Sequence, residues 1–448
     1  MLQIQWQRQS ATRMSSNLSA AVAAIANLEA QSTQELNRYI AERAQVLIEH
    51  AGSQNAFYRT RLKAAGWRPG QALSCAAWAN IEPLQRTELQ ERGHELLCPN
   101  LPDDCGDTAW VSSSGSTGRP VRVMGTRQQA GLWQAITVRE HIEQQRDLTG
   151  RLAVIKVTQN DQGQPPEGTR SPDWGAPING LYRTGPSAVL GIDADTDTQA
   201  RWLSAYNPHY LLTYPSNLDA LIDCVGEGSL SLPALHQART FGELVEPDLR
   251  ERCSQHLGVD LIDVYSSAEV GYMATQVPGT AHYRCRNESV LIELLNDKGM
   301  ACQPGEMGRV VITALYSFAM PLLRYEIGDH AIGLDANLFA GAPQFLQHII
   351  GRTRNLLQLP DGSRRWPRLG LRRMTDIAPL RQVQTIQSAL HRLDLKVVCA
   401  APLSTVQRDE LVAHIKRRFS SIEEVTIEEV ESIARAPGHK FEEFRCTI

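Results

Sequence analysis

The sequence lacks the features of disulfide-rich, membrane-spanning and nucleic-acid-binding proteins. Its nine cysteines are scattered and odd in number, without a Cys-x-x-Cys pair, so no disulfide framework is expected. No apolar run has the length of a membrane span, and the short run 20–26 soon meets Glu29, so no secretory leader is predicted. The net charge of -4 argues against an extended nucleic-acid surface. We therefore expect a cytoplasmic protein with neither a membrane nor a nucleic-acid partner.

Two local groupings qualify this picture. His282 and Cys285 have His-x-x-Cys spacing, and Cys302 follows, so these residues could supply zinc ligands, although no fourth ligand is evident. Arginines gather between 364 and 373, where they could form a solvated face or contact a phosphorylated small molecule. Neither grouping decides the function.

The length and the periodicity of the chain predict two domains. A chain of 448 residues exceeds what one hydrophobic core usually serves. Apolar residues recur at helical spacing from 17 to about 65, and alternating strands and helices follow from Thr108 onward. The segment 159–180, rich in Gly, Pro and Asp, is predicted to be a long loop. After Gly351 the pattern becomes that of a small α+β domain, so the fold class is α/β with a large first domain.

The segment 111–123, VSSSGSTGRPVRV, packs hydroxyls and glycines into a single turn after a strand. Backbone N–H groups, hydroxyls and the absence of bulky Cβ atoms suit close contact with a polyphosphate. The loop has no lysine at the position that a Walker loop requires. Taken alone, it fits an ordinary turn as well as a phosphate site.

Further motifs follow this loop in a set order. They are Asp263-Val-Tyr-Ser-Ser-Ala-Glu269, Arg324-Tyr-Glu-Ile-Gly-Asp329, Gly351-Arg-Thr-Arg-Asn355 and Pro437-Gly-His-Lys440. In order and approximate spacing, the five segments resemble those of the adenylate-forming enzymes, which include acyl-CoA ligases, adenylation domains and luciferases. Segments 57–66, 83–89, 207–216 and 358–362 are similar to those of the phenylacetate–CoA ligase and capsule-biosynthesis-like branch.

This resemblance implies an ATP- and acid-binding adenylation domain over residues 1–350, with mixed sheets. It also implies a small, mobile α+β domain over residues 351–448. The expected activity is the activation of a carboxylic acid as an acyl-adenylate, with ATP and Mg²⁺, followed by acyl transfer to CoA. The aromatic residues near the expected acyl pocket suit an aryl or arylacetic acid. Transfer to an amine or to a carrier protein uses the same first step, and a non-catalytic nucleotide- or acyl-binding protein is the rival of another class. A homodimer is left open.

The resemblance also implies individual roles. The phosphate loop would bind the leaving phosphates, Glu269 would hold magnesium, and Lys440 would stabilise the reacting phosphorus. Tyr265 offers a flat face to adenine, and Asp263 can accept from its amine. Asp329 would bind the ribose, and Arg352 would reach the ribose or the α-phosphate. The remaining nucleotide-binding positions are Ser113, Ser114, Gly115, Ser116, Thr117, Gly118, Gly242, Glu243 and Ser266.

Some positions depart from the family pattern. Ala268 stands where threonine is usual, Ser266 where glycine is usual, and Asn355 where the hinge usually has aspartate. His439 precedes Lys440 in place of the expected glycine. The acyl pocket is expected near Trp174, the segment 210–216 and Glu243. Arg364 and Arg365 could face the CoA channel or solvent.

Overall fold

The structure is a computed structural model that describes residues 11–113, 120–158, 162–226, 228–352, 356–362, 364–365, 367, 369, 371–419, 421–433 and 444–448. The chain divides into two compact units, Met1–Ile349 and Ile350–Ile448.

The first unit begins with three helices, α1 (Ala11–Glu29), α2 (Thr33–Gln54) and α3 (Ala56–Ala64). Ser32 and Glu35 form a capping box that satisfies backbone donors at the start of α2. One apolar stripe of α2 is buried, as its helical spacing predicts. The predicted helical start is confirmed.

A mixed sheet of 12 strands forms the centre of this unit, in the order β11-β12-β13-β14-β10-β9-β8-β7-β6-β3-β5-β4. Strands β8, β7, β6, β3 and β5 run parallel, and β4 closes that edge antiparallel. Their bounds are β3 Leu152–Lys156, β4 Thr169–Ser171, β5 Ser187–Gly191, β6 Tyr210–Thr213, β7 Gln237–Phe241 and β8 Asp260–Ser267.

The other half of the sheet is largely antiparallel, as in the hairpin of β8 with β9 and the ladder of β11, β12 and β13. The bounds are β9 Gly271–Gln276, β10 Tyr283–Cys285, β11 Val290–Leu295, β12 Met307–Ala314, β13 Tyr325–Gly333 and β14 Phe345–Arg352. A separate hairpin, β1 (Thr108–Ser112) with β2 (Arg122–Thr126), flanks the glycine-hydroxyl loop. The predicted mixed α/β class is confirmed.

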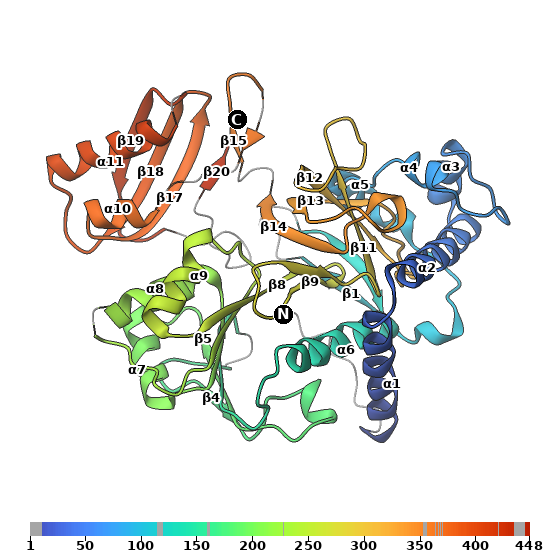
Figure 1. The fold of residues 1–448 in the computed structure, drawn as a ribbon, viewed down its shortest axis with the longest axis horizontal. Helices are drawn as coiled ribbons and strands as arrows, with labels where there is room; N and C mark the ends of the chain where they lie inside the picture. The colour runs from blue at the N-terminus through green and yellow to red at the C-terminus, as the bar shows by residue number, and fades with distance from the viewer. Residues whose placement is uncertain are drawn as a thin grey trace. The chain divides into compact units, whose positions relative to one another are not determined.

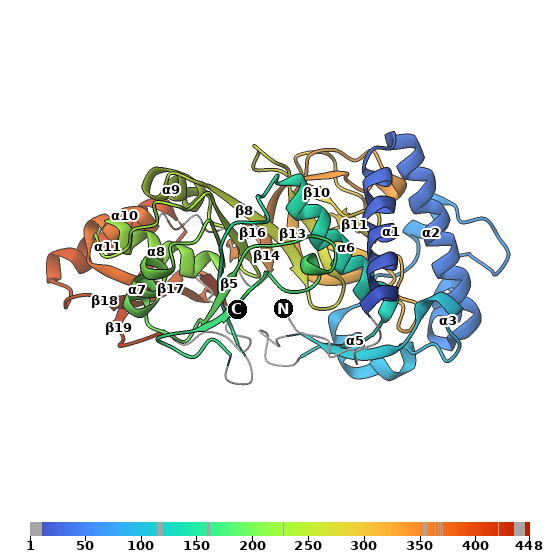
Figure 2. The ribbon, with the colours of Figure 1, turned by 90° about the horizontal axis from the view of Figure 1, so that it is seen from below.

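Helices cover both faces of the parallel half. On one face α7 (Thr196–Tyr206), α8 (Pro215–Gly226) and α9 (Pro247–Leu257) pack on residues such as Ala153, Ile155 and Ala238 (Figure 1). On the other face lies α6 (Arg127–Glu143), with α1 beside it in both views (Figure 2). Two short helices near the site, α4 (Cys75–Ala79) and α5 (Arg86–Arg92), follow α3.

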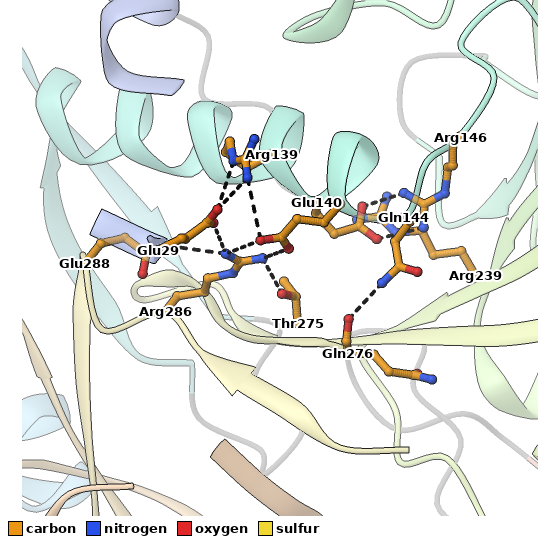
Figure 3. A network of polar contacts seen from close by, with 11 residues as sticks. Glu29, Arg139, Glu140, Gln144, Arg146, Arg239, Thr275, Gln276, Arg286 and Glu288 are labelled. Atoms are coloured by element: carbon orange, nitrogen blue, oxygen red, sulfur yellow. Dashed lines mark hydrogen bonds and ion pairs between the residues drawn. The ribbon is translucent and has the colours of Figure 1, made fainter. Parts of the chain in front are cut away.

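A buried charge network joins α1 and α6 to the antiparallel half of the sheet (Figure 3). The fully buried guanidinium of Arg286 pairs with Glu29 at 2.7 Å, Glu143 at 2.5 Å and Glu288 at 3.6 Å. Arg139 from α6 also pairs with Glu29, at 2.5 Å. Because buried carboxylates without a cation are costly, this network fixes the end of α1 against the sheet.

The second unit is a small α+β body. A four-stranded sheet in the order β19-β18-β17-β20 packs on α10 (Leu371–Ile377) and α11 (Thr405–Arg418). The strand bounds are β17 Leu380–Ala389, β18 Arg392–Cys399, β19 Glu424–Glu429 and β20 Phe444–Cys446, with a hairpin of β15 Leu357–Gln358 and β16 Arg364–Arg365.

The prediction of one long loop over 159–180 is wrong in part. Within the described residues, β4 (Thr169–Ser171) pairs with β5 and a 3-10 turn forms at Ile178–Gly180. The composition of this segment, rich in glycine and proline, does not indicate a strand, because β4 is stabilised by its pairing with β5 and not by local propensity. No helix among the described residues is long and apolar enough to cross a membrane.

Candidate active site

A bulge in strand β13 positions the carboxylate of Asp329. Residues 327–329 oppose a single residue of β12, because the register shifts between the pairs Arg309–His330 and Val311–Glu326. Gly328 has a φ of 90°, which glycine adopts without strain. The Tyr265 hydroxyl donates to Asp329 Oδ2 at 2.7 Å. The fold thus joins the expected adenine-facing ring to the expected ribose ligand.

Arg324, which begins the same motif, is a structural residue. It is fully buried and pairs with Glu293 at 3.1 Å. Its Nη1 also donates to the carbonyls of Ala79 and Ile81 at 2.7 and 2.6 Å. These bonds hold the segment before α5 against β13, and Leu84 then pairs with Tyr325 as a short parallel bridge. This pairing sets the position of α5.

Arg86, the first residue of α5, connects three of the sequence motifs. Its Nη1 lies 3.5 Å from Glu269 Oε1 and 3.3 Å from the Tyr325 hydroxyl, and its Nη2 lies 3.4 Å from Ser113 Oγ. Arg86 is not among the functional residues that the sequence predicts, although the segment 83–89 that contains it resembles one branch of the family. Its role depends on contacts between segments that are distant in the sequence.

Ser113 closes the base of the phosphate-loop candidate. Its N–H donates to the Val121 carbonyl at 2.8 Å, and its Oγ accepts from the Val121 N–H at 2.9 Å. The predicted loop residues Ser114, Gly115, Ser116, Thr117 and Gly118 lie outside the described residues, as do Asn355 and Lys440. The structure therefore places the base of the loop beside Arg86.

Glu269 lies in the turn between β8 and β9. Its side chain is 5% exposed, and Arg86 faces one of its oxygens. The hairpin needs glycine at 271, where φ is 83° and a Cβ would meet the Trp133 ring at 2.9 Å. A magnesium ion bound to phosphates usually takes only one or two protein carboxylates. A single carboxylate with a long, 3.5 Å contact to Arg86 therefore fits the predicted metal role.

Asp263 is buried in the sheet with both oxygens engaged. The Thr240 hydroxyl donates to Oδ1 at 2.8 Å, and the Tyr283 hydroxyl donates to Oδ2 at 2.9 Å. Burial raises the pKa of Asp263 to about 6, although the charge of Arg250 and these two hydrogen bonds lower it. An adenine amine would be a further donor to this carboxylate, so its adenine role stays a prediction.

The remaining predicted positions lie at strand ends. Gly242 follows β7 with a φ of 78°, and Glu243 Oε2 accepts from the Ser216 N–H at 3.1 Å. Ser266 and Ala268 are half-buried at the end of β8 and in its turn. Arg352 ends β14 in the second unit.

The structure separates Trp174 and Tyr210 from the rest of the expected acyl pocket, whereas Ser216 and Glu243 remain in contact. The Trp174 indole donates to the Gly150 carbonyl at 2.9 Å, and its ring packs edge-on against Tyr210 at 5.5 Å. Gly150 precedes β3 and Tyr210 begins β6, so both aromatic residues lie at the amino ends of these strands. Gly242 and Glu243 lie at the carboxyl ends, about 15 Å away along strands that rise about 3.3 Å per residue. The sequence does not indicate which ends of the strands Trp174 covers, because this residue lies in a segment predicted to be a long loop.

The zinc alternative finds no support in the described part of the chain. No group of three or more His, Cys, Asp and Glu side chains there could hold a metal ion. Cys285 is buried, and burial raises the pKa of its thiol. A thiol held protonated in this way is a poor zinc ligand.

No protein-family model matches the sequence. Two curated relatives are the phenylacetate–coenzyme A ligases of Pseudomonas putida and of Escherichia coli (strain K12), each 22% identical. The alignments span 311 and 316 residues, which is 67% of this chain in both cases and 67% and 68% of the relatives.

Solved structures share the fold. A 2-hydroxyisobutyryl-CoA ligase has a TM-score of 0.70 at 19% identity, covering 92% of this chain and 90% of that one. An anthranilate CoA ligase has a TM-score of 0.54 at 16% identity, covering 75% of this chain and 65% of that one. Together with the ordered motifs, these findings show that the chain has the fold of AMP-forming acyl-CoA ligases of the adenylate-forming superfamily and is similar in sequence to the phenylacetate–coenzyme A ligases.

Proposed function

We propose that this protein joins a carboxylic acid to the α-phosphorus of ATP, releases pyrophosphate, and transfers the acyl group from the adenylate to the thiol of coenzyme A. The observation that carries the proposal is the meeting of three motifs at Arg86, which contacts Ser113, Glu269 and Tyr325. Two anions must approach each other in the first step, so a cation and aligned donors are what the site has to supply.

Each residue of the candidate active site has a part in this chemistry. Ser113 and the loop that follows it would donate to the leaving phosphates, and Arg86 would neutralise their charge. A magnesium ion at Glu269 would supply further positive charge to the phosphates. Tyr265 and Asp329, which are hydrogen-bonded to each other, would bind adenine and ribose.

The second unit would supply Lys440 to the adenylation step only. Lys440 would stabilise the transferring phosphorus during adenylation and leave when the small domain, residues 351–448, rotates for acyl transfer. The names of the sequence relatives favour an aryl or arylacetic acid. Those names also support coenzyme A as the acceptor, which makes amines and carrier-protein thiols the alternatives to test.

The test has two stages. Pyrophosphate–ATP exchange is measured with Mg²⁺ across aryl, arylacetic and aliphatic acids, and at least one acid should support exchange. That acid is then incubated with ATP and either CoA, an amine or a phosphopantetheine thiol. Thioester formation with CoA is the expected result. Exchange without thioester, with consumption of the adenylate by an amine, would replace CoA by an amine as the acceptor.

A further inference from the structure

The connections of the parallel strands reverse direction at β3. The chain passes from β3 to its neighbour β5, crosses back to β6 on the other side, and continues outward to β7 and β8. The connection from β3 to β5 packs on the α6 face through Ile178, whereas α7 and α8 cover the opposite face. In open α/β sheets, ligands bind outside the carboxyl ends of the strands at such a reversal. The carboxyl end of β3 is therefore the place to look for a ligand-binding side chain.

Lys156 is the last residue of β3. Its side chain is half-buried, and burial lowers the pKa of its ammonium group. Among the described residues no carboxylate pairs with it, and desolvation alone accounts for the direction of its pKa. Partial desolvation of an ammonium group that has no carboxylate partner among the described residues costs free energy, so an anionic ligand at the end of β3 would stabilise Lys156.

The surroundings of Lys156 belong to the acid side of the proposed site. The next residue, Val157, has its N–H 3.5 Å from the Tyr214 hydroxyl, and the Tyr214 ring lies 4.8 Å from that of Phe241. Phe241 leads directly into Gly242 and Glu243, so the ends of β3, β6 and β7 form one continuous edge.

The sheet spacing sets the distance to the nucleotide side. Tyr265 lies on β8, three strands from β3. Neighbouring strands are about 4.8 Å apart, so the two positions are about 14 Å apart across the sheet. On the same face as Lys156, the side chains of Val154 and Leu212 are apolar and buried. A ligand that reaches Lys156 would therefore lie at the end of a buried apolar row.

We propose that the ammonium group of Lys156 binds a second carboxylate on the acid substrate, distant from the carboxylate that is adenylated. This proposal rests on the proposed function and narrows its substrate class to dicarboxylic acids with an apolar spacer. The carboxylate would pair with the ammonium group of Lys156, while the apolar spacer would lie next to the strand ends, beyond the buried side chains of Val154 and Leu212.

The experiment compares matched acids in wild type, Lys156→Met and Lys156→Arg. The pairs are hexanoate with adipate and phenylacetate with 4-carboxyphenylacetate, assayed by pyrophosphate–ATP exchange. Wild type should show a KM for the dicarboxylate lower by about tenfold or more, as a charge-assisted contact would give. Lys156→Met should abolish that preference and leave the monocarboxylate KM within about threefold, while Lys156→Arg should keep part of it. Lys298→Met, an exposed lysine, is the control.

Calorimetric titration of adipate and 4-carboxyphenylacetate without nucleotide separates the two hypotheses. If no acid supports exchange but these dicarboxylates bind wild type and not Lys156→Met, the anion subsite stands and the ligase function falls. Equal loss of mono- and dicarboxylates in folded Lys156→Met overturns the proposal, and so does an unchanged preference. Absence of dicarboxylate binding to wild type by both methods overturns it as well.

Discussion

Removing the guanidinium of Arg86 should impair adenylation without unfolding the protein. At 3.5 Å from Glu269, the pair has a gross attraction of about 5 kcal/mol at an effective dielectric constant of about 20. Most of this is offset by desolvation, since Arg86 is 17% and Glu269 5% exposed. A net loss of about 1.5–3 kcal/mol is typical when a contact to a charged group is removed. In Arg86→Met we therefore expect kcat/KM for MgATP to fall about 10- to 150-fold.

The assay is pyrophosphate–ATP exchange with a saturating acid, together with thermal unfolding of each variant. Arg92→Met is the matched control, because Arg92 lies on the same helix and pairs with Glu95 while both side chains are exposed. Exposed pairs contribute little, so this variant should exchange at nearly the wild-type rate. Arg86→Met with a wild-type melting temperature and exchange within threefold of wild type would refute the role given to Arg86.

The remaining predictions concern four other residues. Burial raises the pKa of Asp263 to about 6 from an ordinary 3.8, so its contribution to stability is complete below pH 4 and is lost as the pH rises through 6. Asp263→Asn should therefore flatten the pH dependence of urea unfolding between pH 4 and 7 by up to about 3 kcal/mol, and a profile parallel to wild type would contradict this. Tyr265→Phe, which loses the donor to Asp329, should weaken ATP binding about tenfold in calorimetric titration. An unchanged affinity would show that this hydroxyl does not contribute to nucleotide binding. Arg286→Met leaves buried carboxylates unpaired and should lower the free energy of unfolding, measured by denaturant titration, by about 3–5 kcal/mol. A change under 1 kcal/mol would show that the charge network does not stabilise the fold. Lys440→Ala should abolish exchange yet spare acyl transfer from a supplied acyl-adenylate, whereas equal loss of both steps would make Lys440 structural.

Local patterns predicted the elements but not the contacts between them. The helices of residues 17–65 and the strands around 108–123 follow from periodicity, because each buries one face. Asp329 was found through its motif, and Gly328 explains in backbone terms why the motif needs glycine there.

Arg86, Asp263 and Lys156 required the fold. Arg86 meets Glu269 across 183 positions of sequence, and the partners of Asp263 come from two other strands. A lysine at the end of a strand has no periodic signature, so only the strand order revealed that Lys156 lies where the connections reverse. The expected position of Trp174 is wrong because a loop residue has no periodic pattern that would place it at one end of the strands.

We expect this site to form an acyl-adenylate, with Glu269 as the magnesium ligand. The most direct measurement is acid-dependent exchange of labelled pyrophosphate into ATP, titrated with Mg²⁺ in wild type and Glu269→Gln. In wild type, exchange should require both an acid and Mg²⁺. In folded Glu269→Gln, exchange should be slower and should need more Mg²⁺ to saturate, because the metal loses its anionic ligand. If wild-type protein binds ATP yet exchanges no pyrophosphate with any acid, the site does not form an acyl-adenylate. If Glu269→Gln has an unchanged Mg²⁺ dependence, Glu269 is not the magnesium ligand.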